Sequence, residues 1–247
     1  MDSADKGCLY VISGPSGTGK GSICNGLLEK PGIALSVSMT TRDPRPNEVR
    51  GQNYHFVDRN VFQKIIAEDG FYEYAEIFGE YYGTPKAPAQ QLIDKGLDVI
   101  LEIDVDGSRQ IKEKVSNAVL VFVMPPSPEE LRRRMEGRGT ETQERIDKRL
   151  ARSGNEIAQV GRYDYCVIND ILEEAIEDTY AIILTERLLR GGSRGPEGPI
   201  SGSGESYTAR AERLRIDEAR AEALIESYKN GSVINTGGKN VTSPANR

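Results

Sequence analysis

Short apolar runs and segments with helical spacing alternate along most of this chain. Apolar runs typical of buried strands occur at 8–13, 34–39, 98–104, 118–124 and 164–168. Between the last three runs, apolar positions recur at helical spacing over about 106–115, 127–136 and 141–160. Strands that alternate with helices are typical of a mostly parallel sheet with helices on both faces. The pattern therefore predicts an α/β fold.

The pattern changes between about residues 40 and 90. A polar, turn-rich stretch is followed by the aromatic β-like pieces FYEYAEIF and EYYGT. This part of the chain holds five of the eleven tyrosines: Tyr54, Tyr72, Tyr74, Tyr81 and Tyr82. One interpretation is a small β-rich subdomain packed by aromatic rings. The basic residues favour a second interpretation, an inserted substrate-binding subdomain over 36–89.

The C-terminal part of the chain differs in composition from the rest. A long amphipathic helix is predicted at 173–190, a flexible Gly/Ser/Pro-rich linker at 191–206, and a helix at 207–229 before a disordered tail to 247. The apolar face of the 207–229 helix is narrow, so we expect it to dock on the core or on a second copy of the chain in a homodimer. We expect 191–247 to be dispensable for catalysis.

Composition narrows the classes of function. The 247 residues carry a formal net charge of −6, which argues against broad nucleic-acid or membrane binding. No apolar run approaches the roughly 18 residues that a membrane span needs, and the acidic N-terminus does not resemble a signal peptide. The three cysteines lie far apart and show no metal-binding spacing. We therefore expect a cytoplasmic protein.

The stretch GPSGTGKGS, residues 14–22, nearly matches a phosphate-binding loop. The form G-x-x-x-x-G-K-[ST] is satisfied up to Lys20, but Gly21 stands where the magnesium-binding hydroxyl is expected, and the hydroxyl follows at Ser22. A predicted strand before the loop and a helix after it argue against a chance match. Backbone N–H groups of such a loop bind phosphate oxygens, and the lysine adds a positive charge.

Two further segments carry clustered basic residues. Ser38, Arg42, Arg45 and Tyr54 lie in one irregular stretch and would suit a phosphate dianion, although a solvated basic loop is equally consistent with them. The stretch 131–150 predicts a charged helical hairpin. It is either an exposed hairpin or a mobile lid whose arginines close over phosphates during their transfer.

Six motifs in order resemble those of bacterial guanylate kinases, which phosphorylate GMP with ATP. The resemblance runs from about Gly7 to Arg190 and rests on GPSGTGKGS, SVSMTTRDPRPNEVRGQNYHFV, FYEYAEIFGEYYGT, LEIDVDG, EGRGTET and DYCVIND. In nucleoside monophosphate kinases the hydroxyl is often shifted as at Ser22, and Gly21 reads as a family variant. The resemblance implies a kinase domain over 1–190 with core parts 7–35, 90–125 and 155–190, a GMP-binding insert at 36–89 and a lid at 126–154.

The resemblance also implies roles for individual residues. It implies that ATP is used with magnesium (Mg²⁺), held mainly by phosphates and water with Ser22 as a possible ligand. The implied catalytic residues are Lys20, Arg42, Arg138 and Arg149. Those implied to bind ATP are Gly14, Pro15, Ser16, Gly17, Thr18, Gly19, Lys20, Gly21, Ser22, Arg134, Arg138 and Asn169. Those implied to bind GMP, and dGMP with it, are Ser38, Arg42, Arg45, Tyr54, Tyr82, Glu73, Thr84 and Asp104, with the last three reading guanine.

The chemistry of the base agrees with this implied assignment. Guanine presents N1–H and an N2 amine, two donors that suit the Glu73 carboxylate, whereas adenine presents an acceptor at N1. Where relatives commonly read D-I-D-x-Q-G, this chain reads EIDVDG, with Glu102 and Asp106, and Asp106 in the glutamine position adds negative charge near the phosphates. Two alternatives stay open: a catalytically inactive interaction module of the same family, and a kinase of another small phosphate. The single histidine, His55, is predicted to be structural.

Overall fold

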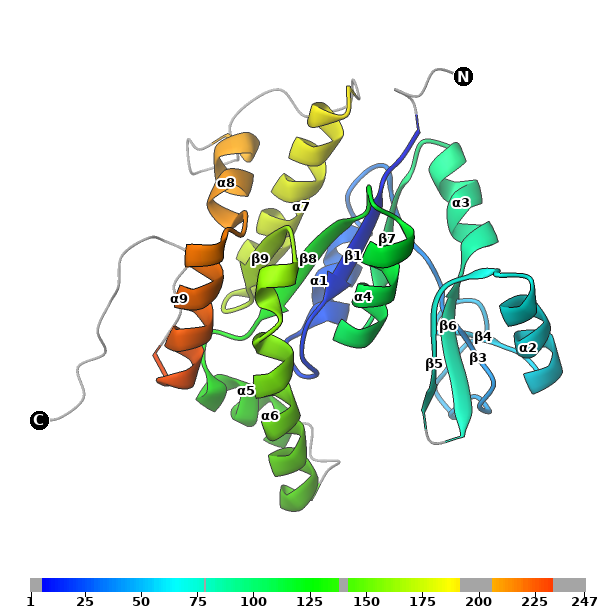
Figure 1. Cartoon of the computed structure of the whole chain (residues 1–247), viewed down its shortest axis with the longest axis horizontal. Coiled ribbons are helices and arrows are strands. Elements are labelled where there is room, and N and C mark those ends of the chain that lie inside the picture. The colour runs from blue at the N-terminus through cyan, green and yellow to red at the C-terminus, as the bar shows by residue number, and fades with distance from the viewer. Residues whose placement is uncertain (1–5, 78, 138–141, 192–205, 233–247) are drawn as a thin grey trace, which may run out of the picture.

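The computed structural model describes residues 6–77, 79–137, 142–191 and 206–232. Its core is a five-stranded parallel sheet in the order β2-β7-β1-β8-β9 (Figure 1). The strands are β1 (Leu9–Ser13), β2 (Ile33–Leu35), β7 (Asp98–Glu102), β8 (Val119–Met124) and β9 (Tyr165–Ile168). Every residue of β1, β8 and β9 is buried, as expected for parallel strands covered on both faces. The predicted α/β class is confirmed.

A second sheet of four strands forms a separate lobe, in the order β4-β3-β6-β5. Its strands are β3 (Met39–Thr40), β4 (His55–Phe56), β5 (Phe71–Ile77) and β6 (Glu80–Pro85), and α2 (Arg59–Ala67) packs on it. The ring of Phe62 stacks against those of Phe71 and Tyr81, with centroids 4.2 and 5.2 Å away. The apolar run predicted as one strand at 34–39 is in fact divided between the two sheets, because β2 ends at Leu35.

Helices cover both faces of the large sheet (Figure 1). The elements that follow the lobe along the chain are α3 (Lys86–Asp94), α4 (Val105–Lys114), α5 (Pro128–Glu136), α6 (Gln143–Ile157), the short 3-10 helix η2 (Val160–Arg162) and α7 (Leu172–Leu189). One apolar cluster joins α7 and α1 (Lys20–Leu27) to the sheet, and the other joins α3, α4 and η2 to its opposite face. Helices α5 and α6 project as a hairpin beyond the carboxyl end of the sheet (Figure 1).

The segment predicted as one helix over 207–229 forms two helices, α8 (Tyr207–Leu214) and α9 (Glu218–Lys229). The chain turns between them because the connecting residues pair with the edge strand β9. Arg215 forms a bridge with Tyr165, and the Ile216 N–H donates to the Asp164 carbonyl at 2.9 Å. The prediction of a single helix was wrong for this reason.

Both C-terminal helices contribute to the core. Leu214 of α8 is fully buried in the cluster on the α7 side, while Leu224 and Tyr228 of α9 are buried in the other cluster. A nearly buried ion pair between Arg210 and Asp178 fastens α8 to α7. This packing removes the basis for expecting the C-terminal extension to be dispensable. The linker residues 192–205 and the tail 233–247 lie outside the described part of the chain.

Among the helices of the described residues, none combines the length and the apolar character needed to cross a membrane.

Candidate active site

The phosphate-binding loop connects β1 to α1 and depends on glycine for its shape. Gly14, Gly17 and Gly19 have φ values of 138°, 91° and 89°, where other residues are strained. A β-carbon on Gly14 would also lie 2.3 Å from the Val123 carbonyl oxygen. The N-cap of α1 is Gly19, which has no side chain to accept from the first N–H groups of the helix, and an uncapped helix N-terminus favours an anion.

The ammonium group of Lys20 is held inside this loop. Its Nζ donates to the carbonyl oxygens of Gly14 and Pro15 at 2.7 and 3.0 Å. Burial lowers the pKa of Lys20, while the negative charges of Glu102 and Glu156 oppose that effect. The loop therefore holds a positioned cation that donates to two of its own backbone carbonyl oxygens.

The side chain of Asn169 binds the backbone of the phosphate-binding loop. Its Nδ2 donates to the Thr18 carbonyl at 2.7 Å, and the side chain is 5% exposed. A β-carbon on Gly19 would lie 2.3 Å from the same nitrogen. The resemblance places this residue near adenine, but the contact in the structure is with the loop backbone.

A second cluster lies in the lobe, around the guanidinium group of Arg42. This group lies over the rings of Tyr54 and Phe56, 5.2 and 5.7 Å from their centroids, and the rings of Tyr54 and Tyr82 meet edge to face. Its Nε is buried and has no hydrogen-bond acceptor among the described residues. A buried donor without an acceptor in the protein is a candidate contact for a bound water or anion.

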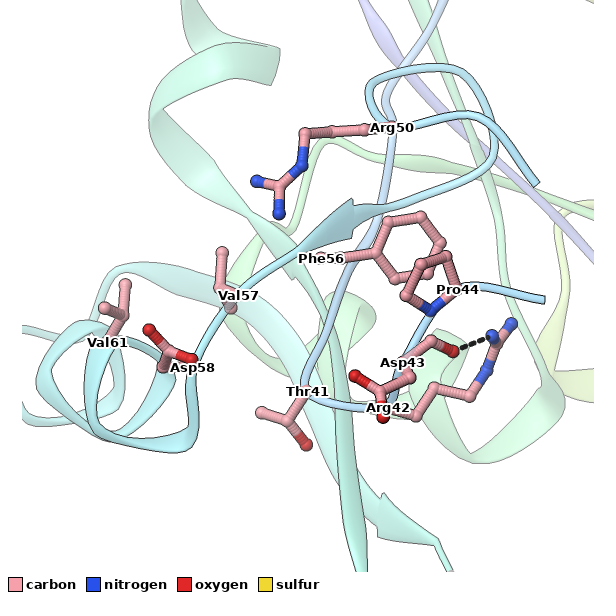
Figure 2. Close-up of a pocket in the computed structure, with 9 residues that line it drawn as sticks. All are labelled: Thr41, Arg42, Asp43, Pro44, Arg50, Phe56, Val57, Asp58 and Val61. Carbon is pink, nitrogen blue, oxygen red and sulfur yellow. Dashed lines mark hydrogen bonds between the residues drawn. The ribbon is translucent and has the colours of Figure 1, made fainter. Parts of the chain in front are cut away.

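A cavity of about 360 Å³ adjoins this cluster on the same loop. Figure 2 shows its lining, with the guanidinium groups of Arg42 and Arg50 at opposite ends and the ring of Phe56 between them. Asp43 and Asp58 also line it, so it lacks the excess of positive charge that a phosphate site needs. Arg45, predicted to bind phosphate, is exposed on this loop, and its backbone N–H donates to Glu48 at 2.9 Å.

The predicted base-reading residues are brought together across β5 and β6. Glu73 and Thr84 are paired in register, and the Thr84 hydroxyl donates to Glu73 Oε1 at 2.7 Å. The Ser38 hydroxyl lies 3.5 Å from that of Thr84. Burial, reinforced by the negative charge of Asp104, raises the pKa of Glu73 to about 7, although the Thr84 hydrogen bonds oppose the rise. Asp104 itself caps α4 by accepting from the Gly107 N–H at 2.8 Å.

The helical hairpin α5–α6 contacts the phosphate-binding loop and the N-terminal end of α4. Arg149 of α6 donates to the Ser16 hydroxyl in the phosphate-binding loop. Arg152, one turn further on, lies 3.9 Å from Asp104 and 3.8 Å from Asp106. Arg134 of α5 pairs with Glu130 at 2.7 Å. Arg138, predicted to be catalytic, lies outside the described residues.

Residues 6–186 match the sequence profile of the family described as Guanylate kinase. The chain is 50% identical over 184 residues to the guanylate kinase of Clostridium perfringens strain SM101, covering 74% of this chain and 85% of that one. It is 48% identical over 186 residues to a guanylate kinase of Thermus thermophilus, covering 75% and 84%. The chain belongs to the guanylate kinase family.

A solved structure of guanylate kinase from Anaplasma phagocytophilum is also similar, with 35% identity, a TM-score of 0.61, and coverage of 74% of this chain and 88% of that one. The guanylate kinase match ends before the linker, so α8 and α9 lie outside it. Sequence reasoning missed one site residue, Glu48, which binds Arg42 and had a signal in the sequence as a carboxylate within the basic loop. Arg152 was expected only as one of several basic residues of the charged hairpin, and in the structure it faces the acidic pair Asp104 and Asp106.

The oxygen groups beside the phosphate-binding loop fit a magnesium ion that retains most of its water. A β-carbon on Gly21 would lie 3.5 and 3.6 Å from the two Glu102 carboxylate oxygens, and Ser22 is exposed on the first turn of α1. Within the described ranges, no group of three or more His, Cys, Asp or Glu side chains could hold a metal ion. This donor set suits a hydrated ion held largely by phosphates.

Proposed function

We propose that this chain transfers the γ-phosphoryl group of ATP to GMP, or to dGMP, producing ADP and the corresponding guanosine diphosphate. The observation that supports it most is the buried pairing of Glu73 with Thr84 in the same lobe that holds the Arg42 cluster. A base-reading pair and a buried arginine donor within one lobe suit a purine monophosphate.

The ATP phosphates bind the N–H groups of the loop and the ammonium group of Lys20. Lys20 and Arg149 neutralise the charge that spreads over the γ-phosphoryl oxygens in the transition state. The attacking group is a phosphate oxygen that is already anionic, so no general base is required. Catalysis then rests on positioning and on charge neutralisation.

When guanine binds, the Thr84–Glu73 hydrogen bond of the free protein is replaced by several hydrogen bonds to the base. In the free protein the Thr84 hydroxyl donates to Glu73. When guanine binds, N1–H and the N2 amine donate to the Glu73 carboxylate, and the Thr84 hydroxyl turns to donate to O6. Adenine presents N1 as an acceptor to the same carboxylate, which leaves the buried carboxylate without its donors.

Magnesium bound with ATP would supply positive charge that offsets the negative charge of the phosphates. Ser22 and Glu102 would hold it through its water shell, as the fit of these oxygen groups suggests. In this arrangement Glu102 also sets the charge around Lys20, because its carboxylate opposes the lowering of the Lys20 pKa.

A coupled assay of ADP formation with GMP, dGMP, AMP and UMP tests this function. We expect kcat/KM for GMP to exceed that for AMP by about 10⁴, the discrimination typical of a site built on hydrogen bonds. A folded protein that consumed ATP equally with all four nucleotides, or with none, would refute the proposal. The second result would favour a catalytically inactive interaction module.

A further inference from the structure

Glu48 forms a two-pronged ion pair with Arg42 in the loop between β3 and β4. Its Oε2 and Oε1 accept from the two terminal nitrogens of Arg42, each at 2.6 Å. The two side chains are only 15% and 14% exposed. By contrast, the Arg59–Glu76 pair of the same lobe is 46% exposed at both partners. The first pair is therefore built into the loop rather than lying on its surface.

The ion pair with Glu48 determines which N–H groups of the Arg42 guanidinium already have an acceptor in the protein. The NH1 group donates to Glu48 and also to the Asp43 carbonyl at 2.8 Å, and NH2 donates to Glu48. The guanidinium group also lies over the rings of Tyr54 and Phe56, which restrict its movement. The Tyr82 hydroxyl also accepts a hydrogen bond from the guanidinium group. By contrast, Nε is buried and has no acceptor among the described residues. Glu48 thus leaves one directed N–H for a ligand.

We propose that Glu48 is a positioning residue for the GMP phosphate. It holds both terminal nitrogens of Arg42 so that Nε donates to a phosphate oxygen. It also accepts from the Arg45 N–H at 2.9 Å, which fixes the backbone of the second arginine of the loop. This inference rests on the proposed function and deepens it, since it names a residue that acts on the substrate through Arg42.

A different role would have the opposite consequence. If the Glu48 carboxylate occupied the place of the phosphate, GMP would have to displace it, and removing its charge would tighten GMP binding. The contacts favour positioning, because displacement would break the bonds to Arg42 and to the Arg45 backbone, whereas Nε has no acceptor to give up among the described residues. The hydrogen bonds from Arg42 and Arg45 hold the pKa of Glu48 at about 2, so the carboxylate stays charged at neutral pH.

The test compares Glu48→Gln and Glu48→Asp with Glu76→Gln as the control from the exposed pair. Glu48→Gln keeps the size of the side chain but loses the charge that holds Arg42. We expect it to raise KM for GMP, and Kd for GMP measured by calorimetry without ATP, about 10- to 100-fold, the range for a hydrogen bond to a charged group. In Glu48→Gln, KM for ATP should stay within about threefold of wild type. Glu48→Asp should recover part of the lost GMP affinity, and Glu76→Gln should bind GMP as wild type does.

Unchanged or tighter GMP binding in a folded Glu48→Gln protein would overturn the proposal. If that variant does not fold, Glu48→Asp decides, because the shortened carboxylate must still weaken GMP binding. A double-mutant cycle adds a second criterion: in an Arg42→Ala background, Glu48→Gln should have little further effect on Kd. A full effect in that background would contradict action through Arg42. Failure of wild type to phosphorylate GMP would refute the proposed function instead, because Kd is measured without turnover.

Discussion

Replacing Glu73 by glutamine should make the free protein more stable and the enzyme worse at using GMP. Glu73 is 8% exposed, and its pKa is raised from 4.5 to about 7, chiefly by burial. At about 1.4 kcal/mol per pKa unit, this difference is worth about 3 kcal/mol. The folded protein binds this proton more tightly than the unfolded chain does, so ionised Glu73 opposes folding. That cost grows as the pH rises from 4.5 to about 7 and then levels off.

Glutamine removes the ionisation but can still accept from the Thr84 hydroxyl. The gain in stability of Glu73→Gln over wild type should therefore increase by about 2 to 3 kcal/mol between about pH 5 and pH 8. Urea denaturation of both proteins across this range measures the difference in their free energies of unfolding. The contributions of the other titrating groups cancel in this difference, because both proteins contain them. A stability difference that did not change with pH would refute the assignment of a buried, ionising Glu73.

The same group should control how GMP use depends on pH. Guanine requires the ionised carboxylate, so kcat/KM for GMP should fall about tenfold for each pH unit below 7. The GMP phosphate also titrates near pH 6. Glu73→Gln separates the two effects, since it keeps the phosphate titration and should lose the step near pH 7. At about pH 8 the variant should lose about 2 to 4 kcal/mol of transition-state stabilisation with GMP. Retention of the step near pH 7 in the variant would show that another group is responsible.

Two further changes test other parts of the structure. Lys20→Met should lower kcat by about 10³ or more at unchanged melting temperature, because it removes the loop cation that neutralises the phosphoryl group; near-normal turnover in a folded variant would exclude Lys20 from the mechanism. Truncation after Arg190 should lower stability by roughly 5 kcal/mol or more, since it removes the buried side chains of Leu214, Leu224 and Tyr228. Chemical denaturation measures this loss against a chain truncated after Ser232, and equal stability of the two would show that α8 and α9 contribute nothing to the core.

The sequence by itself was sufficient for features that depend on short stretches of chain. Apolar runs identified the strands β1, β7, β8 and β9, because both faces of a parallel sheet are covered and most positions along such a strand are apolar. The glycines of GPSGTGKGS identified the phosphate-binding loop, because only glycine readily adopts the positive φ values at Gly14, Gly17 and Gly19. The family motifs also pointed to Glu73 and Thr84, which the lobe places side by side.

Other features were decided only by contacts between distant parts of the chain. The 34–39 run is divided because Met39 pairs with Gly83 in the lobe, and the 207–229 helix is broken because Arg215 pairs with Tyr165 at the sheet edge. Neither the apolar run at 34–39 nor the helical spacing at 207–229 predicts these pairings. A strand partner far along the chain can override the local propensity of a segment. The sequence could name the acidic residue Glu73 but could not show that its pKa is about 7. That value comes chiefly from the loss of water around the carboxylate, which exists only once β6 and α4 have packed against it.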